Sequence, residues 1–162
     1  MTKSDDGTQR AFATFRVVGD KLHPADITQI LHTVPTFSFR KGEKYQPGDR
    51  SPVMAGKTGT WFFSTDRVVA SPRLDDHVTY LLKMILPHSG ATDQLTALRD
   101  LIHRKNLKAV VTLFWHGRSG SRKPSLPTTA LDIFKLLPAT VEVDFDADEE
   151  PPRKRAAVSS RA

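Results

Sequence analysis

The chain has 162 residues, of which 38% are hydrophobic and 26% charged, and it carries a formal net charge of +6. This composition suits a single globular domain. Because the chain contains no cysteine, disulfides, thiolate metal sites and cysteine nucleophiles are excluded. The polar first residues and the absence of an apolar run near the roughly 20 residues that span a bilayer predict a cytoplasmic protein without a membrane segment.

The positive charge is unevenly distributed. Four of the six net charges come from residues 151–162, which leaves +2 for the rest of the chain. A nearly neutral body carrying a basic tail gives little reason to expect phosphate binding from the charge alone.

Alternating and helical patterns of apolar residues predict the elements in chain order. In residues 10–18, Ala11, Ala13, Phe15 and Val17 share one side of a strand, opposite Phe12, Thr14 and Arg16. A helix starting near Pro24 ends before Pro35. Residues 36–40 and 60–65 form a predicted hairpin around a long loop. Two helices, a very apolar strand at 107–115, a helix near 128–137 and a strand at 139–146 follow.

This order predicts an α+β fold. We expect a ferredoxin-like βαββαβ core with an added helix and strand, in which a mixed or antiparallel sheet has its helices on one face. Residues 1–9 are predicted to be disordered, residues 10–146 to form the domain, and residues 147–162 to form a disordered tail that is first acidic and then basic.

Several of these segments resemble a known bacterial family, domain of unknown function 4279. The similarity covers residues 12–146, and its most specific parts are Pro35-Thr36, Arg40-Lys41-Gly42 and Trp61. The resemblance implies a small bacterial α/β protein. It implies no activity, cofactor or catalytic residue.

Short strings that look catalytic do not fit their own requirements. Lys57-Thr58-Gly59-Thr60 and Ser38-x-x-Lys41 match motifs of penicillin-binding enzymes, but Ser38 lies in a predicted strand rather than at a helix start. Gly56-Lys57-Thr58 lacks the first P-loop glycine, since position 51 is serine. The histidines are scattered without metal-ligand spacing. We therefore predict no catalytic residue, metal or cofactor.

Two basic loops next to aromatic strands are the candidate binding elements. The residues we single out for binding are Arg40, Lys41, Lys57 and Trp61 around the first loop, and Trp115, His116 and Arg118 around the second. An aromatic surface bordered by cations could stack bases and hold phosphates. Alternatively, the aromatic residues form the core and the cations a solvated border.

Three functions remain open at this stage. The first is a non-enzymatic binding protein, of an immunity or regulatory type, that engages a protein partner. The second is a nucleic-acid-binding module that uses the basic loops with Trp61 or Trp115 as a stacking platform. The third, and the least expected, is an enzyme that holds a small anionic substrate through Arg40 and Lys41.

Overall fold

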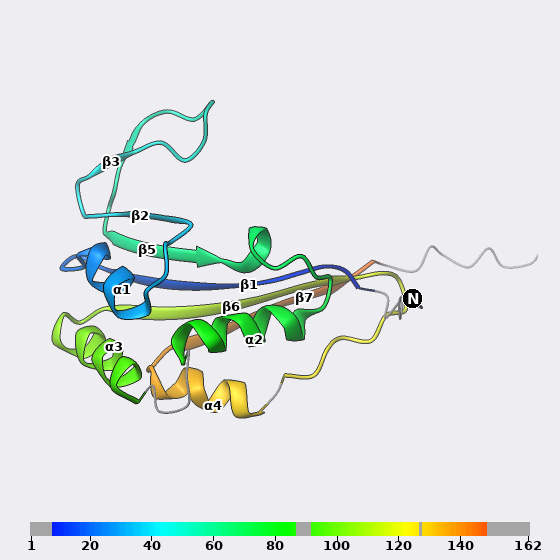
Figure 1. Ribbon diagram of the computed structural model, residues 1–162. Coiled ribbons are helices and arrows are strands. Elements are labelled where there is room, and N and C mark those ends of the chain that lie inside the picture. The colour runs from blue at the N-terminus through cyan, green and yellow to red at the C-terminus, as the bar shows by residue number, and fades with distance from the viewer. Residues whose placement is uncertain (1–7, 87–91, 127, 149–162) are drawn as a thin grey trace, which may run out of the picture.

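The computed structural model describes residues 8–86, 92–126 and 128–148. Figure 1 shows a sheet with a layer of helices, and the expected helices and strands are all present. The elements in chain order are β1 (Thr8–Gly19), α1 (Pro24–Leu31), β2 (Phe37–Phe39), β3 (Lys44–Tyr45), β4 (Met54–Ala55), β5 (Gly59–Ser64), the 3-10 helix η1 (Thr65–Arg67), α2 (Leu74–Ile85), α3 (Thr92–Arg104), β6 (Lys108–Gly117), α4 (Thr128–Leu136) and β7 (Thr140–Ala147).

The main sheet has five strands in the order β2-β5-β1-β6-β7. β1 pairs antiparallel with both β5 and β6, while β7 runs parallel to β6 after the α4 crossover. The sheet is therefore mixed, and the α+β prediction is confirmed. The order of the first four of these strands is compatible with the predicted ferredoxin-like core, to which α4 and β7 are added.

The helices pack on one face of this sheet (Figure 1). The alternation predicted for β1 is confirmed, since Ala13, Phe15 and Val17 are completely buried beneath the helices. Strand and helix side chains together make one hydrophobic cluster, whose larger members are Phe15, Ile27, Trp61, Phe63, Leu81, Ile85, Leu98, Leu113, Trp115, Phe134 and Leu137. In the part of the chain that the structure describes, no helix is both long and apolar enough to cross a bilayer.

Within the long loop between β2 and β5 the chain forms a small hairpin, β3–β4, that the sequence patterns did not predict. It extends past the β2 end of the sheet (Figure 1). Phe39 stacks on Tyr45, with ring centroids 4.2 Å apart. A Cβ at position 56 would lie 2.6 Å from the Phe39 ring, so only glycine lets the returning strand pass this close. Gly56 is therefore required for close packing against Phe39. This agrees with the conclusion from the sequence that Gly56-Lys57-Thr58 is not part of a P-loop.

β1 begins at Thr8, two residues earlier than expected, because its pairing with β6 continues as far as Gly117. β7 likewise extends to Ala147. The predictions of disorder for residues 1–7 and 149–162 lie outside the described residues.

Candidate functional site

The face of the sheet opposite the helices carries an unusual number of aromatic side chains. Phe12, Arg16 and Phe114 alternate with the buried core residues of β1 and β6, so their side chains lie on the face opposite the helices. Phe37 and Phe62 continue this surface across β2 and β5. We call this surface the open face and define it by Arg10, Phe12, Arg16, Phe37, Phe62 and Phe114.

The rings of the open face form two stacked pairs across neighbouring strands. Phe12 lies directly opposite Phe114, and the ring centroids are 4.5 Å apart with planes inclined by 17°. Phe37 and Phe62 are related in the same way, at 4.6 Å and 19°. Such pairs contribute roughly 0.5–1.5 kcal/mol beyond the area they bury. Phe37 still leaves 48% of its surface exposed and the other three rings are partly exposed, so the pairs form an apolar surface that solvent reaches mainly at Phe37.

Two arginines on the same face are held very differently. The guanidinium of Arg10 lies 5.0 Å from the ring centroid of Phe12 and 5.9 Å from that of Phe114, and it donates to Asp66 at 2.8 Å. Arg16 lies between the two aromatic pairs, opposite Phe62 on β5 and Val110 on β6. Within the described ranges its side chain has neither an ion-pair nor a hydrogen-bond partner. Arg16 is thus a guanidinium at the middle of the face that a ligand could pair with.

The far border of this face is acidic. Glu142, Asp144 and Asp146 alternate on β7 and are all exposed. Their partners on β6 are Thr112, Phe114 and His116, which places the carboxylates on the open side of the sheet. The face therefore runs from aromatic and cationic at β2, β5 and β1 to anionic at β7.

The two tryptophans expected to form a stacking platform are in the core instead. Trp61 is 0% exposed and Trp115 is 2% exposed. Trp61 pairs with Val17 and Trp115 with Ala11, so both point to the helix side of the sheet. The Nε1 of Trp61 donates to the hydroxyl of Thr28 on α1 at 3.1 Å. No base can reach either ring, so the predicted role of Trp61 and Trp115 in stacking is wrong.

The two basic loops do not form a common site. Arg40, Lys41 and Lys57 lie near the end of β1 where Gly19 pairs with Gly59, whereas His116 and Arg118 lie at its beginning, where Thr8 pairs with Gly117. At about 3.3 Å per residue, these ends of β1 are roughly 35 Å apart. His116 Nε2 contacts the Asp148 carboxylate at 2.9 Å, and Arg40 and Lys57 are exposed.

Lys41 is engaged by an acidic neighbour. Its Nζ donates to Asp20 Oδ2 at 2.9 Å. This hydrogen bond, with a second one from Thr58 and the charge of Lys41, lowers the pKa of the fully exposed Asp20 below its ordinary value of 3.8. An anion at Lys41 would have to compete with this carboxylate.

We therefore predict a measurable titration effect at Asp20. By NMR, its carboxyl pKa is expected below 3.8 and to move up towards that value in Lys41→Met, because the largest stabiliser of the charged form is removed. A lowered folded-state pKa means that the pair stabilises the fold above the unfolded pKa, and this contribution disappears as the pH falls through the folded pKa. An unchanged pKa in Lys41→Met would contradict the pairing, and Lys57→Met is the matched control.

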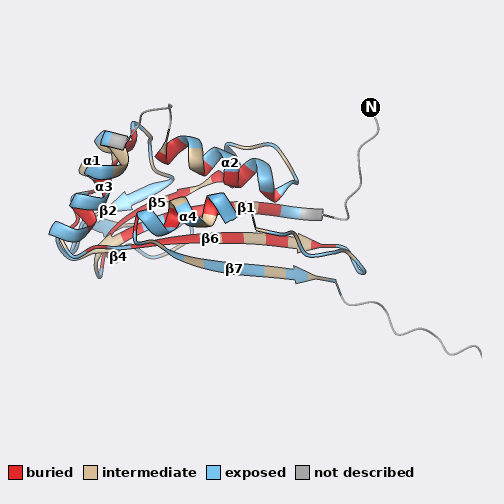
Figure 2. Cartoon of the chain, turned by 90° about the horizontal axis from the view of Figure 1, so that it is seen from below, coloured by how far each residue is buried: buried red, intermediate tan, exposed pale blue. Residues whose placement is uncertain are grey.

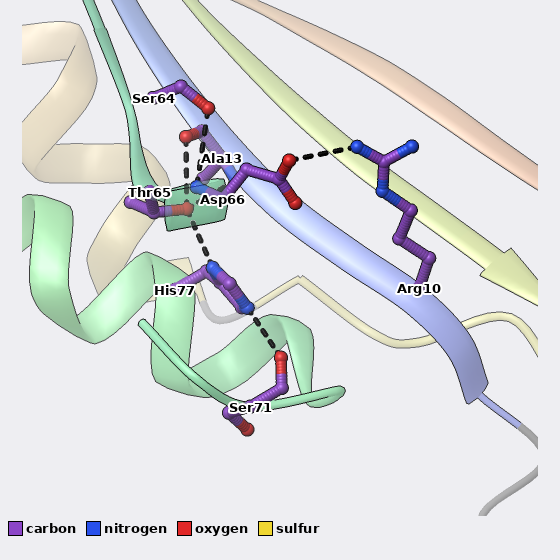
Figure 3. Close-up of polar contacts among 7 residues, drawn as sticks. All are labelled: Arg10, Ala13, Ser64, Thr65, Asp66, Ser71 and His77. Atoms are coloured by element: carbon purple, nitrogen blue, oxygen red, sulfur yellow. Dashed lines mark hydrogen bonds and ion pairs between the residues drawn. The ribbon is translucent and has the colours of Figure 1, made fainter. Parts of the chain in front are cut away.

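A second polar cluster lies buried between β1, η1 and α2 (Figure 3). The Thr65 hydroxyl accepts from the Ala13 amide at 2.9 Å and donates to the Ala13 carbonyl at 3.1 Å, and its oxygen lies 2.6 Å from His77 Nδ1. On its other side, His77 Nε2 lies 2.7 Å from the Ser71 carbonyl. A carbonyl only accepts, so Nε2 of His77 carries a hydrogen and donates to the Ser71 carbonyl.

This threonine–histidine pair resembles an activated nucleophile but lacks access to a substrate. Thr65 is 0% exposed, and its oxygen already accepts from the strand amide. A depression of about 290 Å³ lies beside His77, lined also by Arg10, Asp66 and Ser71. The hydroxyl does not open into solvent there, so the geometry favours a structural joint that fastens α2 to the sheet.

Comparison with known proteins places the chain in a family. The family model described as "Domain of unknown function (DUF4279)" matches residues 9–148. The chain belongs to this family. No curated protein and no solved structure matches the chain. The matched range takes in all five strands of the main sheet, the open face and the Thr65–His77 joint. The resemblance inferred from the sequence is thereby confirmed.

The alternation in β1 also contains Phe12 and Arg16, two open-face residues that were not among the predicted binding residues. Phe12 and Arg16 have the opposite phase of alternation to the core residues Phe15 and Val17. A strand with large side chains in both phases has either two covered faces or one aromatic face left open. Sequence alone does not distinguish these cases for the DUF4279 chain, because packing decides which face of the sheet each helix covers.

Among the described residues, no group of three potential ligands could hold a metal ion.

Proposed function

We propose that this member of the DUF4279 family is a non-enzymatic binding protein that engages a protein partner through the open face of its sheet. The observation that carries the proposal is the two aromatic stacks near Arg16, in which Phe37 is exposed and the other three rings are partly exposed. We include a bacterial cytoplasmic location in the proposal, because a chain without cysteine is compatible with a reducing compartment.

The composition of the open face supports a protein partner. The cores of protein interfaces are enriched in aromatic residues and arginine and depleted in lysine. Binding energy concentrates in a few such residues, surrounded by contacts that exclude water. On this face, Phe37, Phe62 and Phe12 provide rigid apolar area, and Arg16 provides a charge that a partner carboxylate could pair with.

Two observations make nucleic acid the weaker alternative. The Phe12–Phe114 and Phe37–Phe62 rings already stack on one another, so part of the ring surface that a base would need is occupied. The acidic residues of β7 border the same face and would repel a phosphate backbone that crossed it. Arg16 and the cations that flank the β3–β4 hairpin are the features that would favour nucleic acid, and the test below includes this outcome.

The proposal is tested by photo-crosslinking in the native host. A benzophenone side chain at position 37, on the open face, is compared with one at Arg99, an exposed residue of α3. We expect one discrete protein adduct at position 37 and none at position 99. Arg16→Glu is expected to weaken the interaction by at least about tenfold, as the loss of a central arginine does in protein interfaces.

The same variants distinguish the alternatives. Adducts of equal yield at both positions, or an adduct at position 37 that Arg16→Glu leaves unchanged, would refute the proposal. Binding of single-stranded DNA or RNA at low salt that Arg16→Glu abolishes would assign the face to nucleic acid. Exchange of the four cations within residues 151–162 for glutamine controls for attraction by the tail.

A further inference from the structure

The sheet ends at β7, and nothing that the structure describes pairs with the outer edge of this strand. β7 is the terminal strand in the sheet order and bonds to β6 alone. Figure 2 shows it as the border of the sheet, coloured mainly as exposed, with no helix or strand along its outer side. Its eight residues therefore present a row of backbone donors and acceptors to solvent.

Most of the usual means of blocking such an edge are absent from β7. Native sheets protect edge strands with charged side chains, above all lysine, and with proline, bulges or very short strands, and of these β7 has only its three carboxylates. Residues 140–147 contain neither proline nor lysine, and their register with β6 is continuous from Thr140 to Ala147. By contrast, the opposite edge strand, β2, has only three residues and is followed by the β3–β4 hairpin. Of the two edges, β7 is the long, regular and open one.

The two sides of the β7 edge differ in chemistry. On the open-face side, Glu142, Asp144 and Asp146 form an acidic row. On the helix side, Val143 is 47% exposed, and Val141 and Phe145 are partly exposed. The exposed fraction of Val143 is large for an aliphatic side chain. A strand added here would meet carboxylates on one face and apolar surface on the other.

We propose that the β7 edge binds an extended protein segment in which basic and apolar side chains alternate. Successive side chains of a strand point to opposite faces, so such a segment would direct its cations at the acidic row and its apolar residues at Val143 and Phe145. Opposite charges on neighbouring strands attract and like charges repel. The repulsion disfavours pairing of β7 with a second copy of itself, because the two acidic rows would then meet. This edge borders the open face at Phe114, the register partner of Asp144, but it engages the unpaired backbone of β7 rather than the aromatic rings.

The test uses the full-length protein and a fluorescent eight-residue peptide that alternates lysine and valine. Binding is measured by polarisation, and amide hydrogen exchange is followed across β7. We expect saturable binding and slower exchange in β7. The substitution Asp144→Lys should weaken binding about tenfold. Asp100→Lys on α3 changes the net charge equally and should leave binding within about twofold.

Backbone methylation separates strand addition from simple charge attraction. Two further peptides carry N-methyl groups on either the odd or the even amides, because only one set faces the partner strand. Loss of binding with one set and not with the other supports the proposal. It is overturned if no saturable binding occurs up to about 1 mM peptide, if both methylated peptides bind fully, or if Asp100→Lys weakens binding as much as Asp144→Lys.

Discussion

Trp61→Ala is expected to lower the free energy of unfolding by about 3–5 kcal/mol, the usual range for emptying a buried tryptophan site. The ring is completely buried and packs edge-on against Phe15, with centroids 6.1 Å apart. Its Nε1 also bonds to Thr28, so the substitution removes a link between β5 and α1. Urea denaturation of the purified protein measures the loss.

The neighbouring position provides the matched control. Phe62 is adjacent in sequence but points to the open face, where it stacks on Phe37. Phe62→Ala is expected to cost about 2 kcal/mol, since it removes one aromatic pair and the apolar area of a partly exposed ring. A Phe62→Ala cost as large as that of Trp61→Ala would mean that the two faces of β5 are assigned the wrong way round. The affinity for the open-face partner should fall more in Phe62→Ala than in Trp61→Ala.

This contrast shows how far the sequence predicts the fold. Alternation in residues 10–18 assigned Phe15 and Val17 to one side of β1, and the structure confirms that side as the core. The order of strands and helices also implied an α+β sheet with one added helix and strand. These features depend on local periodicity, which the sequence records directly.

The candidate site was less predictable because it depends on which face the helices cover. Trp61 and Phe62 are both aromatic, and only the pairing of Trp61 with Val17 assigns the tryptophan to the core. The two basic loops look equivalent in sequence, yet antiparallel pairing with β1 sends them to opposite ends of the sheet. The β3–β4 hairpin has two-residue strands, too short for an alternating pattern to reveal.

The Thr65–His77 joint was also missed, since its partners are far apart in sequence. The Thr65 hydroxyl takes the place of a strand neighbour for the Ala13 amide, just beyond the end of β5. A threonine after a strand and a histidine in a helix have no pattern that links them. Only the fold brings them to 2.6 Å.

Substitution of Thr65 by valine is expected to cost about 2–4 kcal/mol, because it leaves the buried Ala13 amide and His77 Nδ1 without partners. Valine keeps the shape of threonine, so the loss reports on hydrogen bonds rather than on a cavity. Thr65→Ser retains the hydroxyl and should lose only about 1 kcal/mol. Thermal and urea unfolding of both variants provide the measurement.

A double-mutant cycle with His77→Leu then isolates the contact between the two side chains. Once Thr65 is valine, His77 has lost its partner, so replacing it should cost less than it does in the wild type. We expect a coupling energy of about 1–2 kcal/mol, and additivity within about 0.5 kcal/mol would contradict the contact. A structural joint also predicts that Thr65→Val, when folded at low temperature, binds the open-face partner as the wild type does. If Thr65 and His77 instead acted on a substrate, Thr65→Ser and Thr65→Val would differ in activity at equal stability, and the proposal of a non-enzymatic protein would be wrong.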